Sequence, residues 1–266
     1  MYIQNSYVDE SRGKLYIIPT PIGNLEDITY RAVRLLGEVD LIAAEDTRHT
    51  KKLLSHFNIQ KETISYHEHN HQERMPYLLE RLKKGETIGL VSDAGMPAIS
   101  DPGYDLVIKA IEEKVAVIVL PGANAALTAL VGSGLATDEF LFTGFLPRKK
   151  KDKEAVLRRL KSKQATLIIY ESPHRILDTL GVMEKILGNR RMTIARELTK
   201  MYEQFIRGSI SELVAWLQDH PVRGECVLVV EGVTEELATE ENWWKALSLQ
   251  EHVTYYEQEA NLSHKE

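Results

Sequence analysis

The sequence contains a single cysteine, Cys226, among its 266 residues. One cysteine can form neither a disulfide within the chain nor a zinc site built from several thiolates. It lies in the apolar run Cys226–Val230. That setting is typical of a small buried hydrophobic residue rather than of a reactive thiol.

Long hydrophobic runs are also missing. No apolar stretch approaches the roughly 20 residues that cross a membrane, and residues 1–5 lack a basic region followed by an apolar run. The composition, 43% hydrophobic and 27% charged, is that of a globular protein in solution. We therefore predict a cytoplasmic protein without a membrane segment.

Two glycine-rich patterns that hold phosphates, G-x-G-x-x-G and G-x-x-x-x-G-K-[ST], are absent. Their absence argues against a dinucleotide-binding fold of the Rossmann type and against a P-loop. The net charge of −6 argues against a chain that coats nucleic acid indiscriminately. Residues 147–163 are an exception: nine Lys or Arg against two acids give +7, so the remainder carries −13.

Short apolar runs alternate with helical patterns, which predicts an α/β fold of βαβ units. We expect strands at 15–19, 41–44, 63–66, 87–92 and 115–120, then at 140–144, 166–170, 192–195, 204–207 and 226–230. Only a short polar connection separates the strand at 192–195 from the strand at 204–207. This spacing predicts that the two strands form a hairpin. We therefore expect two α/β domains: 14–121 with a mostly parallel sheet and 122–232 with a mixed sheet. Residues 1–13 would be an extension, and 233–266 an acidic, helical tail.

Three expected strand ends carry small residues at 19–25, 92–103 and 121–126. Small residues let a ligand approach the backbone, and the carboxyl ends of parallel strands share one edge of a sheet. The three segments thus predict a ligand crevice, in which Asp93 could accept hydrogen bonds from a ribose or an ammonium group. Asp101 fits a helix N-cap instead.

Polar groups follow other strands. Glu45 and Asp46 are candidates for acid–base chemistry, although a capped helix start explains one acid. His67, His69 and His71 could suggest a metal, but no cysteine supports it and a solvated or substrate-facing loop is preferred. In the second half, Ser172 fits an N-cap. Three cations at strand ends could hold a phosphate: Arg175, Arg196 and Lys200.

Many of these segments, in order from about residue 14 to 232, resemble the tetrapyrrole methylase superfamily, and within it the family of 2′-O-methyltransferases that act on 16S ribosomal RNA. The matching segments are LYIIPTPIGNL (15–25), EDTR (45–48), YHEHN (66–70), SDAG (92–95), DPGY (101–104), LPG (120–122), GFLP (144–147), YES-x-HR (170–175) and ARELTK (195–200).

The resemblance implies an enzyme that uses S-adenosylmethionine to methylate a cytidine of the decoding centre. It implies a class III methyltransferase fold, with the cofactor cleft between the two domains, and a homodimer. Carried over by position, it assigns the cofactor pocket to Pro21, Ile22, Gly23, Asp93, Ala94, Gly95, Met96, Ala123, Asn124 and Ala125. The family commonly continues into a basic helical module, so we expect that module to be missing or truncated here.

A ribose hydroxyl is a poor nucleophile at neutral pH, so a base should assist it. Glu45, Asp46 and Glu171 are the candidates. We predict RNA contacts at Arg48, Lys149, Lys150, Lys151, Arg175, Arg196 and Lys200, to naked 16S rRNA or to the small subunit. The alternative to RNA binding by residues 148–163 is a helix whose lysines are merely exposed to solvent. In that case its apolar residues Ala155, Val156 and Leu160 would be packed inside the protein. Alternative functions are methylation of a small tetrapyrrole or a protein side chain, and RNA binding without catalysis.

Overall fold

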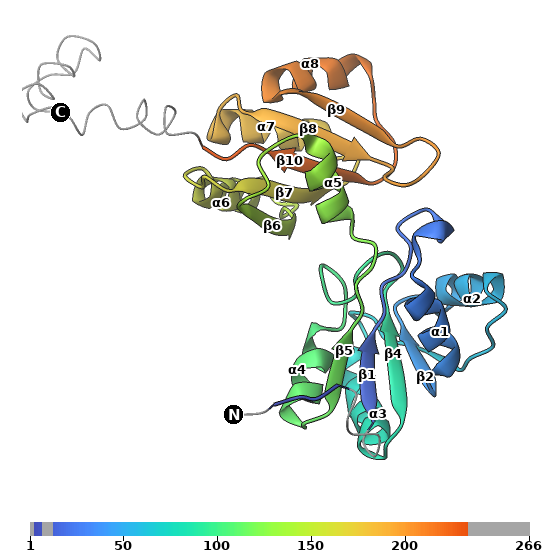
Figure 1. The fold of residues 1–266 in the computed structure, drawn as a ribbon. Helices are drawn as coiled ribbons and strands as arrows, with labels where there is room; N and C mark the ends of the chain where they lie inside the picture. Colours follow the sequence, from blue (N-terminus) through green and yellow to red (C-terminus); the bar gives the residue numbers. More distant parts are fainter. Residues whose placement is uncertain (1–2, 7–12, 234–266) are drawn as a thin grey trace, which may run out of the picture.

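The computed structural model describes residues 3–6 and 13–233, and it contains two α/β units that follow one another along the chain (Figure 1). The expected helical tail at 233–266 lies almost wholly outside the described residues. No helix in the described part is both long and apolar enough to cross a membrane.

The N-terminal unit is built on one sheet of five strands in the order β3-β2-β4-β1-β5, in which every pair is parallel. The strands are β1 (Lys14–Ile17), β2 (Leu41–Ala44), β3 (Thr63–Ser65), β4 (Thr87–Val91) and β5 (Ala116–Val119). The expected strands were thus placed to within two residues at each end.

Helices cover both faces of this sheet. They are α1 (Tyr30–Glu38) and α2 (Thr47–His56) on one face, and α3 (His71–Lys83) and α4 (Tyr104–Glu112) on the other. Successive strand residues point to opposite faces, so Leu41 packs with α3 and α4 while Ile42 packs with α1 and α2. This two-sided burial explains why β2 is an uninterrupted apolar run.

The C-terminal unit has a mixed sheet in the order β6-β7-β10-β8-β9. Its strands are β6 (Phe140–Phe145), β7 (Thr166–Glu171), β8 (Arg191–Arg196), β9 (Gln204–Ser209) and β10 (Cys226–Val230). Only β6 and β7 pair in parallel, and β8 and β9 form the expected hairpin. Cys226 is buried in β10, as its apolar setting predicted.

One face of the mixed sheet is covered by α5 (Ala125–Ser133), and the other by α6 (Lys150–Leu160), α7 (Ile176–Leu187) and α8 (Ile210–Asp219). Residues 120–124 run from the end of β5 to the start of α5 and connect the two units (Figure 1). The carboxyl ends of β1, β2, β4 and β5 therefore share the sheet edge from which the chain passes into the C-terminal unit.

Candidate active site

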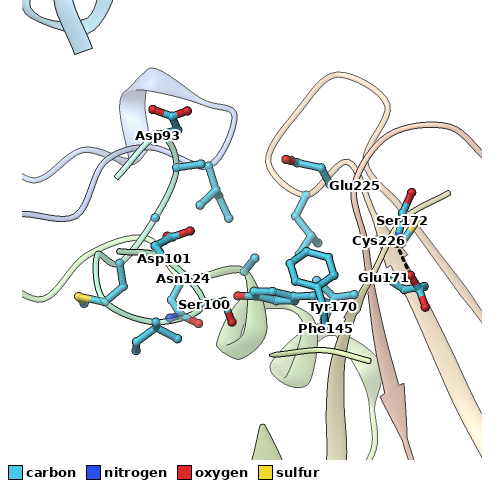
Figure 2. Close-up of a pocket in the computed structure, with 18 of the residues that line it drawn as sticks. Asp93, Ser100, Asp101, Asn124, Phe145, Tyr170, Glu171, Ser172, Glu225 and Cys226 are labelled. Carbon is cyan, nitrogen blue, oxygen red and sulfur yellow. Dashed lines mark hydrogen bonds between the residues drawn. The ribbon is translucent and has the colours of Figure 1, made fainter. Parts of the chain in front are cut away.

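A cavity of about 410 Å³ lies between the carboxyl edge of the parallel sheet and the C-terminal unit (Figure 2). The N-terminal unit contributes loops that follow β1, β2 and β4, and the C-terminal unit contributes the ends of β6 and β7 and the start of β10. The lining residues are Ile22, Glu45, Asp93–Met96, Ile99–Asp101, Asn124, Ala125, Phe145, Tyr170–Pro173, Leu198 and Glu225–Val227.

The loop after β4 is held against the loop after β1 by a short antiparallel bridge. Thr20 and Gly95 exchange two backbone hydrogen bonds of 3.0 Å, and the Thr20 hydroxyl donates to the Ser92 carbonyl at 3.1 Å. Gly95 has a φ of 81°, which a residue with a side chain rarely adopts. The bridge therefore fixes the segment that carries Asp93 and Ala94 at the cavity.

Asp93 also joins the ends of β2 and β4. Its Oδ1 accepts a hydrogen bond from the backbone N–H of Asp46 at 3.0 Å, and its own N–H donates to Oε2 of Glu45 at 3.3 Å. Burial, followed by the nearby Asp93 charge, raises the pKa of Glu45 above its usual value, against the backbone hydrogen bond that lowers it. The cavity is thus acidic on the side of the N-terminal unit.

The opposite wall is aromatic. The rings of Phe145 and Tyr170 meet edge to face with centroids 5.6 Å apart. Figure 2 shows the Tyr170 hydroxyl directed across the cavity toward the loop that carries Ser100 and Asp101. Burial raises the pKa of Tyr170, so its hydroxyl stays protonated near neutral pH.

The structure brings together most of the residues predicted for the cofactor. Ile22, Asp93, Ala94, Gly95, Met96, Asn124 and Ala125 line the cavity. Asn124 is also the N-cap of α5, with its side-chain oxygen accepting from the Leu127 N–H at 3.0 Å. Pro21 and Gly23 line an adjoining cavity of about 370 Å³, which shares Asp93 with the first. The Ala123 carbonyl faces Gly95.

The predicted base candidates are placed differently from one another. Glu45 lines the cavity, whereas Asp46 is the N-cap of α2, as the capping alternative predicted, and binds the Arg48 side chain at 2.6 Å. Glu171 belongs to a cavity-lining segment, but its carboxylate has no exposed surface. That carboxylate accepts from the Ser172 N–H at 2.7 Å and the Thr179 hydroxyl at 2.6 Å.

The predicted RNA cations divide into two groups. Lys149, Lys150 and Lys151 are exposed at the start of α6. The four others have partners within the protein. Arg48 binds Asp46, and Arg175 donates to the Leu146 carbonyl. Arg196 donates to the Gln204 side chain, and Lys200 binds Glu197 and Glu225.

The basic segment also holds a charge that is not at the surface. Lys153, counted among its nine cations, is buried beside Asp178. On the same helix Leu157 and Leu160 are buried and Val156 packs against the core, whereas Ala155, expected to be packed, is exposed.

Two capping predictions were wrong. Helix α4 begins after Gly103, without a side-chain cap, so Asp101 is not an N-cap and instead lines the cavity. Helix α7 begins at Ile176 rather than next to Ser172, whose hydroxyl accepts from the His174 N–H at 3.4 Å.

The three histidines do not form a metal site in the described part of the chain, where no group of three His, Cys, Asp or Glu side chains is arranged to hold a metal ion. The rings of His67 and His69 lie 6.0 Å apart. His71 begins α3, and its Nδ1 is 3.3 Å from Oδ2 of Asp105.

Comparison with known proteins gives a consistent result. Residues 14–214 match the family model described as Tetrapyrrole (Corrin/Porphyrin) Methylases. A relative from Halalkalibacterium halodurans, named Ribosomal RNA small subunit methyltransferase I, is 56% identical over 96% of this chain and 89% of its own length. A relative of the same name from Bacillus subtilis is 53% identical over 92% of this chain and 84% of its own length.

Solved structures share the fold. A diphthine synthase superimposes with a TM-score of 0.63 at 13% identity, covering 86% of this chain and 93% of that one. A uroporphyrin-III C-methyltransferase from Thermus thermophilus, in complex with S-adenosylhomocysteine, gives a TM-score of 0.58 at 19% identity, covering 82% and 97%. At these identities the similarity concerns the two-unit architecture alone.

Proposed function

This chain belongs to the tetrapyrrole methylase family, in the group of ribosomal RNA small subunit methyltransferase I, and we propose that it transfers a methyl group from S-adenosylmethionine to 16S ribosomal RNA. Membership makes it a methyltransferase. We further propose that the acceptor is the 2′-hydroxyl of one cytidine in the decoding centre, as the sequence resemblance implies.

The observation that carries the proposal is the cavity between the two units. Its volume of about 410 Å³ falls within the range of small-molecule sites. S-adenosylmethionine is a nucleoside joined to a sulfonium and an amino acid, so it suits a site with both apolar and acidic walls. Ile22, Met96 and Leu198 supply apolar surface, and Glu45 and Asp93 supply negative charge for cationic groups.

The residues that would hold the methyl donor are those at the strand ends. We assign this role to 93–96 and 124–125 in the cavity, with Ala123 beside Gly95 and with Pro21, Ile22 and Gly23 in the loop after β1. When bound, the donor supplies a methyl group activated by a positively charged sulfur. The protein then has to align the acceptor oxygen with that methyl group and to exclude water.

The names of the relatives favour RNA over the two alternative substrates. Relatives above 50% identity are named for ribosomal RNA, whereas the diphthine synthase and the uroporphyrin-III methyltransferase share less than 20% identity with this chain. We propose that Lys149, Lys150 and Lys151 contact RNA phosphates, because they are exposed at the start of helix α6, which follows the cavity-lining strand β6. Such contacts would strengthen binding most at low salt.

Blocking the cavity tests where the donor binds. Ala94 is exposed and lines the cavity, so Ala94→Trp should keep the fold while filling the space. We expect calorimetry to show S-adenosylmethionine binding at least about tenfold weaker, a loss of roughly 1.4 kcal/mol. The matched control is Ala155→Trp on the exposed face of α6, which should bind like the unaltered protein. Equal binding by Ala94→Trp and the control would contradict the assignment.

We also propose that the protein acts as a homodimer in the cytoplasm. The support is the sequence resemblance together with an exposed apolar face on α5, where Leu127 and Val131 lie one turn apart and retain 49% and 78% of their accessible surface. Light scattering at micromolar concentration should give twice the mass of one chain. A mass of one chain would contradict the dimer.

A further inference from the structure

Asp101 is an acidic residue of the cavity that the sequence patterns assigned to a helix cap rather than to the site. It lies in the loop between β4 and α4, and its carboxyl group faces the cavity on the side opposite Tyr170 and Glu225 (Figure 2). The adjacent helix does not use it, because α4 begins after Gly103 without a side-chain cap. The Ser92 hydroxyl at the end of β4 donates to the Ala94 and Gly95 carbonyls at 3.4 and 3.5 Å and interacts with the Asp101 carboxylate.

The loop that carries Asp101 has an unusual backbone. Ala98 and Ser100 have φ values of 65° and 61°, which are uncommon for residues with a side chain. Ser100 also reaches the other unit: its Oγ lies 2.9 Å from the position that a Cβ on Gly144 of β6 would occupy. Residues held in such conformations cluster at functional sites. The loop thus fixes Asp101 where the two units meet.

The surroundings of Asp101 disfavour its negative charge. Burial is the main cause, and Glu45 and Asp93 on the neighbouring loops add repulsion, so that the pKa of Asp101 rises to about 7 although the Ser92 hydrogen bond lowers it. Tyr170 and Glu225 face it from the C-terminal unit, and Glu225 is paired with Lys200 at 3.1 Å. A carboxylate of this kind can accept a proton near neutral pH, where an ordinary carboxylate is too weak a base.

We propose that Asp101 is the general base of the methyl transfer; this inference rests on the proposed function above. The acceptor oxygen forms a bond to the methyl carbon, and the electron pair of the broken carbon–sulfur bond stays on sulfur. The hydroxyl proton passes to a carboxylate oxygen of Asp101. The products are the 2′-O-methyl ribose, S-adenosylhomocysteine and protonated Asp101, which then releases its proton to water.

The other carboxylates near the cavity have structural partners. Asp46 caps α2 and holds Arg48, which keeps the pKa of Asp46 well below its usual value. Glu171 accepts hydrogen bonds from Ser172 and Thr179 inside the C-terminal unit. Glu45 also lines the cavity and has a raised pKa, but its Oε2 accepts a hydrogen bond from the Asp93 backbone, which stabilises its charged form. Asp101 is therefore a better candidate for the base than the three residues that the sequence indicated.

Asp101→Asn tests the proposal, because asparagine has nearly the same shape and cannot take the proton. Asp105→Asn is the matched control on the exposed start of α4. We expect Asp101→Asn to bind S-adenosylmethionine as the unaltered protein does and to lower kcat by about 10²–10⁴-fold. Asp101→Glu, which keeps a carboxyl group, should recover part of the rate, and Asp105→Asn should keep all of it.

Two pH measurements complete the test. In the unaltered protein kcat/KM should rise about tenfold per pH unit below about pH 7 and then level off, and Asp101→Asn should lose this rise. Carboxyl NMR of the protein without ligand should show one aspartate titrating near pH 7 that is missing in Asp101→Asn. A variant with normal kcat and pH profile, or one that fails to bind the donor, overturns the proposal. An unaltered protein that methylates no RNA overturns the proposed function instead.

Discussion

Replacing the buried lysine Lys153 with methionine should destabilise the C-terminal unit. The Lys153 side chain is only 2% exposed, and its Nζ lies 2.7 Å from Oδ2 of Asp178 and 3.0 Å from Oγ1 of Thr179. The Thr179 hydroxyl in turn donates to Oε2 of Glu171 at 2.6 Å. Lys153 is therefore the buried cation of a polar network that runs through Thr179 to Glu171 on a cavity-lining strand, where Arg175 is a second cation. Methionine keeps the length of the side chain and removes the charge.

The size of the effect follows from burial. Removing one partner of a buried ion pair costs roughly 3–5 kcal/mol, because the remaining charge lacks compensation. The Asp178 side chain is 69% exposed, so water can solvate its carboxylate after the substitution. We therefore expect a loss below this range, about 2 kcal/mol, close to that of one hydrogen bond to a charged group, which for a protein of this size lowers Tm by about 4–8 °C.

Urea and thermal unfolding followed by circular dichroism measure this loss. Lys151→Met is the matched control, because Lys151 is exposed on the same helix and its replacement should change the free energy of unfolding by no more than about 0.5 kcal/mol. Equal stability of the Lys153 and Lys151 variants would refute the reasoning. It would show that the buried ammonium contributes nothing that methionine cannot replace.

Three further predictions concern the site. Asp93→Ala should weaken S-adenosylmethionine binding by about tenfold to a hundredfold, the effect of one charge-assisted hydrogen bond; unchanged calorimetric binding by the folded variant would remove Asp93 from the pocket. Replacing Lys149, Lys150 and Lys151 with Gln should flatten the slope of log RNA affinity against log salt by about 0.7–0.9 per lysine, while donor affinity stays constant; normal binding at all salt concentrations would argue against RNA contacts there. Folding raises the pKa of Asp101 from 3.8 to about 7, so the contribution of this carboxyl group to the free energy of unfolding is complete below pH 3.8 and is lost as the pH rises through 7. In denaturation at several pH values, the free energy of unfolding of Asp101→Asn should lack this decline. An identical decline in both proteins would contradict the shift.

Much of the fold was predictable because most strands contain a short apolar run flanked by polar residues. β2 and β10 were predicted with their observed bounds, since both are buried on two faces and lack an alternating pattern. Helix α5 gave no comparable signal. Its first residues are small and follow Pro121–Gly122, so the sequence indicated a ligand-binding turn, and Asn124 was not recognised as an N-cap.

The site was predictable only in part. Parallel strands place their carboxyl ends along one edge, so the small residues after β1, β4 and β5 could be expected to converge. Asp101 could not be singled out, because Asp-Pro-Gly before an apolar helix equally suits a cap. The roles of Phe145 and Tyr170 depend on how the C-terminal unit faces the first sheet, and this arrangement has no local sequence pattern.

The most direct test of the proposed function is mass spectrometry of ribosomal RNA after reaction. Small subunits from a strain that lacks this gene are incubated with the purified protein and S-adenosylmethionine bearing a labelled methyl group, and the RNA is digested to nucleosides and to fragments. The account predicts one labelled methyl group per 16S RNA, on the 2′-oxygen of a single cytidine. Label on a base, label on ribosomal protein, or no label in RNA would contradict it.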